Sequence, residues 1–510
     1  MILTTTEEAR RLDAAAMTEY GLPEAVLMEN AGAAIVRLAA ELVRWRGAQA
    51  VMVCGTGNNG GDGFVAARYA RAAGAEVTAL LMGNPAHMGE AARMYRRAAE
   101  MAGVPVVEIA KASEALPYFA EASVIVDALI GTGLASAVTG EKAALLSYMN
   151  DADALVVAAD VPSGLMSDTG RAAGAAVEAD VTVALGSVKR GEVLYPGSDY
   201  CGRLLYAPIG IPDTAREAYP VRLMEAEDAA VRLPVRTRVS HKGKNGFIGI
   251  FAGSSGMEGA ALLAAQGALY AGGGKIALQT VAPAAALLAG RVPEVMVHAL
   301  ADGPCFTEAM LPAALEAADA YDVTAMGCGF GREETTQKFV EGFVRRFAKP
   351  LVLDADALFA AAKRRIPFED CPGDIIITPH VGEFAQLTGL SPAEIEARRI
   401  DCAREYAAAH RVTVVLKGAP TVTALPDGTA WVNPTGNPGM ASGGMGDTLT
   451  GIVAALSGQG MAAGDAASVG VYLHGLAGDI AAETAPVGYT ASDVARFVPP
   501  ARARVMKAAE

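Results

Sequence analysis

The chain has 510 residues, more than one ordinary hydrophobic core organises, so two or three domains are expected. Hydrophobic residues make up 52% of it and charged residues 19%, which allows each domain to bury a large core. The net charge of −14 argues against a nucleic-acid or acidic-membrane partner, although it leaves room for a local basic pocket.

Cysteine usage and the start of the chain bear on the cellular compartment. The six cysteines lie far apart and form no Cys-x-x-Cys pair, a pattern typical of reduced thiols. The N-terminus lacks the basic and apolar segments of a signal peptide, and no apolar run is long enough to cross a bilayer. We therefore expect a cytoplasmic protein without a membrane partner.

The first part of the chain alternates between helical and extended patterns. Residues 7–46 have helical character, and Pro23 opens the second helical piece. A strand over 50–54 enters a glycine-rich segment at 55–63, and a helix is expected over 64–73. This order is the first unit of a doubly wound sheet. Further strands are expected over 77–82, 106–109, 124–129, 155–160 and 181–185, which predicts a mostly parallel sheet covered by helices on both faces.

A second αβ set follows the Pro- and Gly-containing stretch 195–228, which we interpret as the linker. A helix is expected over 259–271, a hairpin around Pro426-Asp427-Gly428, and a capping box at Ser391 and Glu394. Strands are expected over 246–253, 275–281, 295–300, 322–328, 351–354, 375–378 and 412–416. The predicted fold class is α/β with two doubly wound domains.

Polar residues follow the strands of the first set. Asn59 lies in the glycine-rich segment, while Asp127, Asp160 and Ser163 follow later strands. Because the carboxyl ends of parallel strands gather at one edge, these side chains are expected to meet. A single such residue is more simply explained as a turn residue bonding its own backbone, but the set favours a site. Its oxygens suit a hard cation together with a polar ligand.

The most informative stretch of the second half is 437–451. A helix is predicted to start near Gly446, and free N–H groups and the helix dipole attract anions there. Gly443 and Gly444 let the backbone approach a phosphate closely. Asp447, in the first turn, suits a proton acceptor better than a phosphate ligand, since like charges repel. The alternative is a flexible linker with a capping aspartate.

Other loops of the second half also end predicted strands. Lys417 can offset phosphate charge, and Gly418 permits close backbone approach. His380 and Glu383 lie in one short loop, where a structural histidine bonded to its own loop is as well supported as a functional one. A metal pair is less favoured, because no third ligand is evident.

Five ordered motifs, at 20–23, 27–32, 57–63, 126–133 and 160–164, resemble the NAD(P)H-hydrate epimerase domain over residues 1–215. The resemblance implies a Rossmann-like sheet and a potassium ion near Asn59, Asp127 and Ser163. Asp160 becomes the candidate acid–base group at C6 of the hydrated nicotinamide ring; Lys189 is a weaker candidate, because its surroundings differ from the expected Pro-Lys. The implied substrate-binding residues are Asn58, Asn59, Gly60, Gly61, Asp62, Gly131, Thr132, Gly133, Leu134, Ala135, Ser136, Ala137 and Asp160.

Residues 222–510 resemble the ADP- or ATP-dependent NAD(P)H-hydrate dehydratase, a ribokinase-like domain, most specifically at 437–441 and 443–447. The resemblance implies nucleotide binding, with Mg²⁺, and Asp447 as the catalytic base. The sequence departs from the family pattern at Phe359, Val381 and Cys328, where Asn, Pro and Pro are usual. The implied substrate-binding residues are Ala261, Gly329, His380 and Asp447, and the implied nucleotide-binding residues are Lys417, Gly418, Ala419, Pro420, Thr421 and Gly446.

Together the two halves resemble bifunctional nicotinamide nucleotide repair enzymes. Such an enzyme interconverts the R and S forms of hydrated NADH or NADPH and dehydrates the S form at the expense of ADP or ATP. Two alternatives stay open: a small-molecule kinase in the second half, since Gly-x-Gly-Asp also serves phosphoryl transfer, and a non-enzymatic binding scaffold in the first. We expect a homo-oligomer; the sequence decides neither ADP against ATP nor NADH against NADPH.

Overall fold

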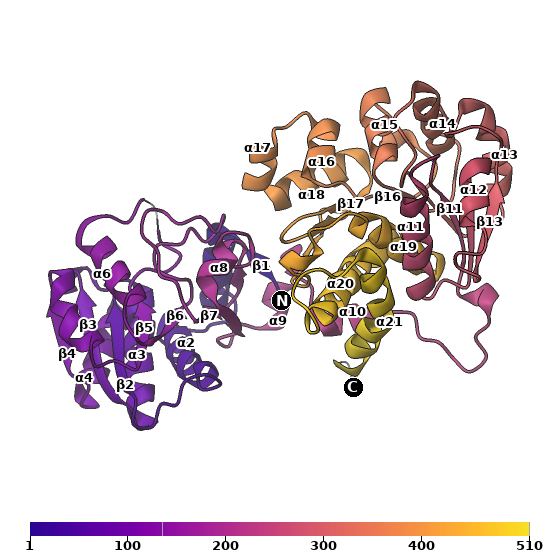
Figure 1. Ribbon diagram of the computed structural model, residues 1–510. Helices are drawn as coiled ribbons and strands as arrows, with labels where there is room; N and C mark the ends of the chain where they lie inside the picture. The colour runs from indigo at the N-terminus through magenta and orange to yellow at the C-terminus, as the bar shows by residue number, and fades with distance from the viewer. Residues whose placement is uncertain (135, 509–510) are drawn as a thin grey trace. The chain divides into compact units, whose positions relative to one another are not determined.

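The computed structural model describes residues 1–134 and 136–508, and the chain divides into two compact units, Met1–Val221 and Arg222–Glu510 (Figure 1). Both units combine helices with a mostly parallel sheet, so the predicted α/β class is confirmed. Among the helices of the described residues, none is both long and apolar enough to cross a bilayer.

The first unit is built on a seven-stranded parallel sheet with the order β4-β3-β2-β5-β6-β7-β9. The strand order reverses between β2 and β5, and ligands bind doubly wound sheets outside the carboxyl ends of the strands at this point. The strands are β2 (Gln49–Cys54), β3 (Glu76–Met82), β4 (Val106–Ile109), β5 (Val124–Ala128), β6 (Leu155–Ala159), β7 (Val181–Leu185) and β9 (Arg203–Ala207).

Helices cover both faces of this sheet, as the alternation predicted. Side chains of β2 alternate between two cores: Met52 packs with α2 (Glu24–Ala39), α3 (Asn58–Ala72) and α4 (Glu90–Met101), while Val53 packs with α5 (Leu116–Phe119) and α6 (Gly140–Asn150). Strands buried on both faces carry apolar residues at nearly every position, which explains their continuous hydrophobic runs.

The start of α3 differs from the prediction. The helix begins at Asn58, six residues before the expected Phe64, so most of the predicted glycine loop lies inside its first turns. A Cβ at Gly60 would lie 1.9 Å from the Gly55 carbonyl oxygen, and one at Gly63 would lie 2.7 Å from the Ala128 Cβ. The close packing of α3 against β2 and β5 therefore requires glycine at these positions. This packing outweighs the low helix propensity of glycine.

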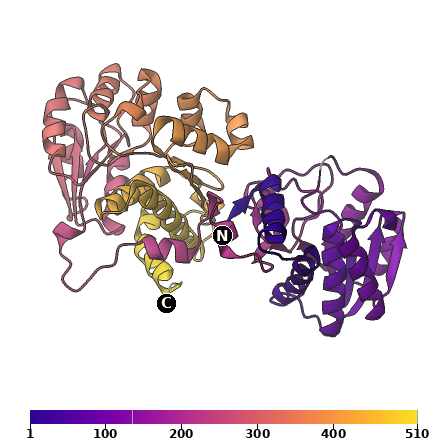
Figure 2. The ribbon, with the colours of Figure 1, turned by 180° about the vertical axis from the view of Figure 1, so that it is seen from behind.

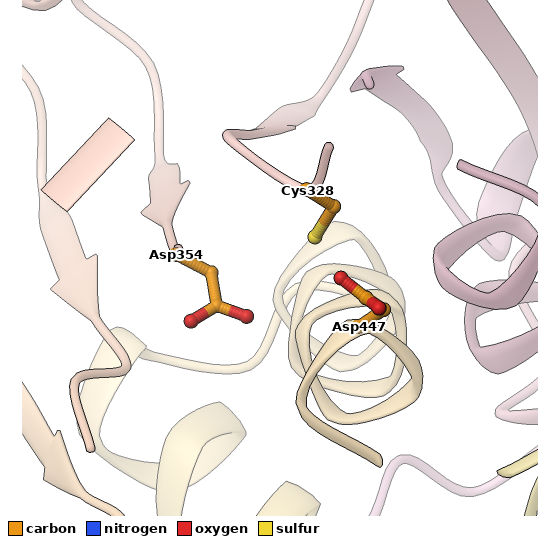
Figure 3. Close-up of side chains that lie close together, drawn as sticks. All are labelled: Cys328, Asp354 and Asp447. Atoms are coloured by element: carbon orange, nitrogen blue, oxygen red, sulfur yellow. The ribbon is translucent and has the colours of Figure 1, made fainter. Parts of the chain in front are cut away.

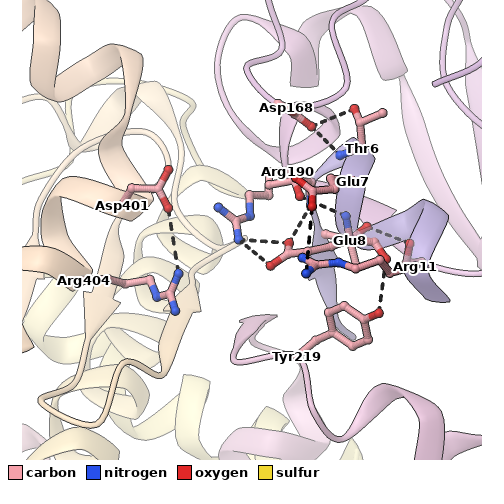
Figure 4. A network of polar contacts seen from close by, with 12 residues as sticks. Thr6, Glu7, Glu8, Arg11, Asp168, Arg190, Tyr219, Asp401 and Arg404 are labelled. Carbon is pink, nitrogen blue, oxygen red and sulfur yellow. Dashed lines mark hydrogen bonds and ion pairs between the residues drawn. The ribbon is translucent and has the colours of Figure 1, made fainter. Parts of the chain in front are cut away.

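The N-terminal segment is fastened to the same unit by polar contacts (Figure 4). The short strand β1 (Leu3–Thr4) pairs in parallel with β8 (Val188–Lys189), and α1 (Thr6–Thr18) follows. The Thr6 hydroxyl donates to Asp168 at 2.8 Å, and Arg190 forms an ion pair with Glu8 at 3.1 Å. These contacts fix the position of α1, which lines a cavity of this unit.

The second unit has a ten-stranded sheet with the order β10-β19-β18-β17-β16-β15-β14-β11-β12-β13. The strands from β11 to β17 are parallel, and β18 and β19 form the predicted antiparallel hairpin. The strands are β10 (Val221–Leu223), β11 (Phe247–Phe251), β12 (Lys275–Thr280), β13 (Val295–Ala299), β14 (Val323–Met326), β15 (Leu351–Leu353), β16 (Ile375–Ile377), β17 (Thr413–Leu416), β18 (Val422–Ala424) and β19 (Ala430–Val432).

Helices flank this second sheet as well (Figures 1 and 2). One group, α11 (Glu258–Tyr270), α19 (Met445–Gly458), α20 (Ala463–Ala482) and α21 (Ala491–Ala508), packs together. The remaining helices are α10 (Ala226–Arg232), α12 (Ala282–Leu288), α13 (Leu311–Ala318), α14 (Glu334–Val344), α15 (Asp356–Arg364), α16 (Val381–Thr388), α17 (Pro392–Ala397) and α18 (Arg399–His410). The predicted capping box at Ser391 and Glu394 opens α17 and is confirmed.

The stretch 195–228 is more regular than predicted. It contains α8 (Gly197–Cys201), β9, α9 (Asp213–Arg216), β10 and the start of α10, while α7 (Arg190–Val193) precedes it. Its prolines and glycines stand at the ends of these short elements, where a missing N–H or a positive φ is tolerated, as at Gly202 with φ +54°.

Candidate active sites

A cavity of about 330 Å³ opens at the carboxyl edge of the first sheet. Several predicted residues line it, and they come from α3, from the loop after β5 and from the end of β6. Residues of α1, α2 and β8 complete the wall. The predicted residues on the wall are Asn58, Asn59, Asp62, Gly131, Thr132, Gly133 and Asp160.

Five further predicted substrate-binding residues do not line the cavity: Gly60, Gly61, Leu134, Ser136 and Ala137. Gly60 and Gly61 are buried in the first turn of α3, where a Cβ would collide with Gly55 and Met28. Leu134 packs against the apolar core beneath α6, and Ser136 and Ala137 are exposed. Ala135 lies outside the described residues.

Asp160 and Lys189 form an ion pair inside the cavity. Lys189 is only 2% exposed, and its Nζ also donates to the carbonyl oxygens of Leu185 and Ser187, at 3.1 and 3.0 Å. Asp160 has φ +68°, a conformation that non-glycine residues seldom adopt, and such strain gathers at functional sites. The pair therefore presents a carboxylate and an ammonium group together to the cavity.

Asp127 and Ser163 meet beside this cavity, as their positions at strand ends predicted. Both are fully buried; the Ser163 hydroxyl donates to Asp127 Oδ1 at 2.6 Å, and the Ser163 N–H donates to Oδ2 at 2.7 Å. Burial raises the pKa of Asp127 to about 6, against the lowering effect of these hydrogen bonds.

Asn59 completes the oxygen-bearing set. Its side-chain amide is buried and has no hydrogen-bond partner among residues 1–134 and 136–508, and a Cβ on Gly131 would lie 3.3 Å from it. Gly131 follows Ile130, whose N–H donates to Ser163 Oγ at 2.8 Å, so the amide stands near the Asp127–Ser163 pair. An unsatisfied buried amide beside a carboxylate and a hydroxyl suits an oxygen-seeking cation.

The second site is centred on Asp447 (Figure 3). Cys328 Sγ and carboxylate oxygens of Asp354 and Asp447 all lie within 4.8 Å of one another, at the ends of β14 and β15 and in the first turn of α19. Burial raises the pKa of Asp447 to about 6, and the hydrogen bond from the Cys328 thiol opposes this shift. Asp447 is thus a carboxylate that can exchange a proton near neutral pH.

Lys417 links the elements around Asp447. Its Nζ lies 2.8 Å from Asp354 Oδ1 and 3.9 Å from Glu383 Oε2, and the Thr450 hydroxyl donates to Asp354 Oδ2 at 2.7 Å. A Cβ on Gly446 would lie 3.2 Å from Lys417 Nζ, so glycine leaves the ammonium group close to the start of α19.

The start of α19 has the features of an anion site. Gly444 is the N-cap with φ +89°, and the first N–H groups of a helix have no partner inside it. A Cβ on Gly443 would meet no atom within 4 Å, so packing does not require this glycine, whereas a closely approaching ligand would. N–H groups, a helix dipole and an ammonium group therefore converge beside the Asp447 carboxylate.

Arg399, which is 3% exposed, holds the Lys417–Thr421 loop in place by hydrogen bonds. Its guanidinium donates to the carbonyl oxygens of Leu416 and Lys417, at 3.1 and 3.2 Å. Gly418 has φ +153°, and the Thr421 hydroxyl donates to its carbonyl oxygen at 3.1 Å. Ala419 and Pro420 form the cis peptide bond of the turn.

His380, Ala261 and Gly329 lie on the elements that surround this site. His380 is the N-cap of α16, where its Nδ1 accepts from the N–H groups of Gly382 and Glu383, which supports the structural explanation. Its Nε2 lies 3.4 Å from Glu383 Oε1, and the side chain is 61% exposed. Ala261 is buried on α11, and the Gly329 carbonyl accepts from the Ser254 N–H at 2.7 Å.

Several residues of these sites were not singled out from the sequence. Asp13 and Glu24 reach the first cavity from α1 and α2, and Cys328, Asp354 and Arg399 support the second site. Cys328 carried a signal, because it departs from the family pattern at a strand end. Asp13, Glu24 and Arg399 are ordinary charged residues on helices, and Asp354 follows β15; only the tertiary fold brings them to the sites.

Each half of the chain matches a known protein family. A family model described as NAD(P)H-hydrate dehydratase matches residues 248–500, and one described as YjeF-related protein N-terminus matches residues 24–191. A ribokinase-like superfamily protein from Enterococcus faecalis has the same fold at 24% identity and a TM-score of 0.50, covering 56% of this chain and 96% of that chain. The ADP/ATP-dependent NAD(P)H-hydrate dehydratase of Bacillus subtilis, co-crystallised with ATP and Mg²⁺, is 36% identical, with a TM-score of 0.49 and coverage of 56% and 100%.

Full-length relatives match the chain almost from end to end. The bifunctional NAD(P)H-hydrate repair enzyme Nnr of Thermofilum pendens is 41% identical over 490 residues, covering 95% of this chain and 92% of that protein. The enzyme of Moorella thermoacetica is 39% identical, covering 98% and 96%, and that of Escherichia coli is 38% identical, covering 87% and 83%. The chain therefore belongs to the family of bifunctional NAD(P)H-hydrate repair enzymes.

Proposed function

We propose that this protein repairs hydrated NADH and NADPH in two steps. The first unit interconverts the R and S epimers at C6, and the second removes water from the S epimer at the expense of ADP or ATP. The observation that carries the proposal is the match to repair enzymes of the same two-part architecture over 98% of the chain. The two polar sites at the strand ends supply one reaction centre for each step.

In the first unit, Asp160 is proposed as the base that accepts the proton of the C6 hydroxyl. Its position on the cavity wall, its pairing with Lys189 and its strained backbone support this role. The segments 58–62 and 131–137 are proposed to hold the substrate; Asn58 is already oriented by Glu24, which accepts from its Nδ2 at 2.7 Å.

Asn59, Asp127 and Ser163 are proposed to hold a potassium ion near the substrate. One carboxylate with two neutral oxygens makes a low-charge set, which suits a monovalent cation better than Mg²⁺. The unpartnered buried amide of Asn59 supports the assignment. When bound, such an ion would offer positive charge to the substrate.

Removal of the carboxylate from this set should make epimerisation slow and independent of potassium. Asp127→Ala is expected to reduce the epimerisation rate at least about tenfold, the scale of disturbing a metal's coordination shell. The measurement is the epimerisation rate against KCl concentration, with choline chloride keeping the ionic strength constant. An unchanged epimerisation rate in the variant, or a wild-type rate that does not depend on KCl, would contradict the proposed potassium site.

In the second unit, Asp447 is proposed as the base that takes the C6 hydroxyl proton while the oxygen attacks the terminal phosphorus of ADP or ATP. The N–H groups at the start of α19 stabilise the charge that builds on the transferred group. Lys417 and the loop to Thr421 hold the nucleotide phosphates, with Mg²⁺ offsetting their charge. AMP or ADP leaves as the C6 phosphate ester forms. The ring nitrogen then expels phosphate to give an iminium ion, and loss of a proton from C5 restores the C5–C6 double bond of the reduced nicotinamide.

The two activities are expected to be separable. A fragment that begins a few residues before β10 keeps the whole second sheet and its helices. It should dehydrate the S epimer with ADP or ATP and leave the R epimer, because the proposed epimerase groups are on the other unit. The assay follows both epimers by chromatography; equal consumption of R and S by the fragment would refute the division of labour.

We propose a cytoplasmic location from the state of the cysteines. All six cysteines are free, and Cys54 and Cys328 are fully buried, which fits a reducing compartment such as the cytoplasm. The homo-oligomeric state stays a prediction.

A further inference from the structure

The cavity of the first unit contains more carboxyl groups than its cations can pair. Asp13, Glu24, Asp62 and Asp160 line it, whereas Arg10 and Lys189 are the basic residues on its wall. Asp160 pairs with Lys189, and Glu24 accepts a hydrogen bond from Asn58. Within residues 1–134 and 136–508, no group donates a hydrogen bond to the Asp13 or Asp62 carboxyl or forms an ion pair with it.

These groups line one cavity from different elements: Asp13 from α1, Glu24 from α2, Asp62 from α3, Asp160 from the end of β6, and Lys189 from β8. Like charges in one cavity oppose one another's ionisation, which favours the protonated form of one of these carboxyl groups.

Asp62 is the carboxyl group best placed to hold that proton. Burial raises its pKa well above the ordinary value; the charges of Asp160, Asp13 and Glu24 raise it further, and Lys189 opposes them. Burial raises the pKa of Asp13 only to about 6. Asp62, with its raised pKa and no ion-pair partner among the described residues, and Asp160, ion-paired with Lys189, thus stand in opposite electrostatic surroundings, which is the mark of an acid–base pair.

We propose that Asp62 is the second catalytic group of this cavity and delivers a proton to the ring nitrogen N1 while Asp160 accepts the proton of the C6 hydroxyl. The inference rests on the proposed epimerase function and adds a partner for Asp160. Asp62 is preferred to Asp13 because α3 is locked against β2 and β5 through Gly60 and Gly63, whereas Asp13 belongs to an exposed part of α1. A proton donor must be held rigidly to act.

The step balances without an oxidant or a further reactant. C6 of the hydrated ring carries both N1 and a hydroxyl group. The hydroxyl proton moves to Asp160, the C6–O bond becomes a carbonyl, and the C6–N1 bonding pair moves to N1, which takes the proton of Asp62. Rotation about C5–C6 exposes the other face of the aldehyde. N1 then attacks that face, its proton returns to Asp62, and the oxygen recovers the proton from Asp160.

The test compares Asp62→Asn and Asp62→Glu in the full-length protein. We expect Asp62→Asn to reduce kcat for R-to-S conversion by about 10²-fold or more, the scale of a positioned acid, with little change in KM. Wild-type kcat should fall as pH rises through the pKa of Asp62, because the acid is then lost, and the residual rate of Asp62→Asn should lack this fall. Asp62→Glu, which keeps a carboxyl group, should restore part of the rate.

Two controls separate this inference from the proposed function. Wild-type protein must convert R into S, and Asp62→Asn must still dehydrate pure S epimer at the wild-type rate, which reports that the second unit is intact. A wild-type circular dichroism spectrum and thermal unfolding transition for Asp62→Asn report that the first unit is folded. With H₂¹⁸O as solvent, retention of the C6 oxygen supports cleavage of C6–N1. A kcat within threefold of wild type, an unchanged pH profile in Asp62→Asn, or one solvent oxygen gained per turnover would each overturn the assignment.

Discussion

Asp447→Asn is expected to reduce the rate of dehydration by about 10²-fold or more, the usual contribution of a positioned general base. Asparagine keeps the shape of the side chain in the first turn of α19 but cannot accept the proton of the C6 hydroxyl. Nucleotide affinity should stay the same or improve, because a negative charge beside the phosphates is removed. The measurement is kcat for the S epimer together with the Kd of ADP and ATP.

The pH profile provides an independent check on this base. Because the pKa of Asp447 is raised to about 6, dehydration should fall as the pH drops through 6 and the carboxylate becomes protonated. The Cys328 thiol lowers that pKa by donating to Asp447, so Cys328→Ala should move the decline in dehydration rate to higher pH.

Near-normal turnover of Asp447→Asn would remove the residue from the mechanism. Joint loss of turnover and nucleotide binding would mean that its role is structural.

Lys417→Met is expected to abolish measurable nucleotide binding and to destabilise the second unit. The substitution leaves Asp354, which is 1% exposed, without the ammonium group 2.8 Å away. An uncompensated buried charge costs about 3–5 kcal/mol in the free energy of unfolding. Denaturant unfolding and nucleotide titration measure the two effects.

A double variant separates stability from binding. Lys417→Met with Asp354→Asn removes both charges of the pair, so much of the stability should return while nucleotide binding should not. Burial opposes ionisation of Asp354, but Lys417 and nearby hydroxyl groups lower its pKa below the ordinary value. The pair therefore stabilises the fold at neutral pH, and this contribution is lost as the pH falls through that pKa. Normal nucleotide affinity in the double variant would exclude Lys417 as a phosphate ligand.

The sequence was sufficient to predict the architecture, because buried parallel strands are short apolar runs between turn residues. The strands over 106–109 and 181–185 match β4 and β7, and the hairpin around Pro426-Asp427-Gly428 formed as expected. The start of α3 was missed for a physical reason: its glycines look like a loop locally, and only the contacts of Gly60 and Gly63 with β2 and β5 show why a helix tolerates them.

The candidate sites were predictable where a functional residue ends a strand. Asp127 and Ser163, 36 residues apart, meet because their strands β5 and β6 are adjacent. Asp13 could not be found in this way, since it reaches the cavity only after β1 pairs with β8 and Glu8 pairs with Arg190. Likewise, Cys328 acquires its importance from Asp447, which is more than 100 residues further along the chain.

The measurement that tests the central claim most directly is the return of reduced nicotinamide absorbance when purified full-length protein is given both epimers of hydrated NADH. With ADP or ATP the account predicts conversion of both epimers to NADH, and with no nucleotide it predicts none. In the Asp160→Asn variant, the rapid phase of NADH formation should end when the S epimer is exhausted, because the R epimer is no longer converted into S. Failure of the wild-type protein to regenerate NADH from the S epimer with either nucleotide would contradict the account.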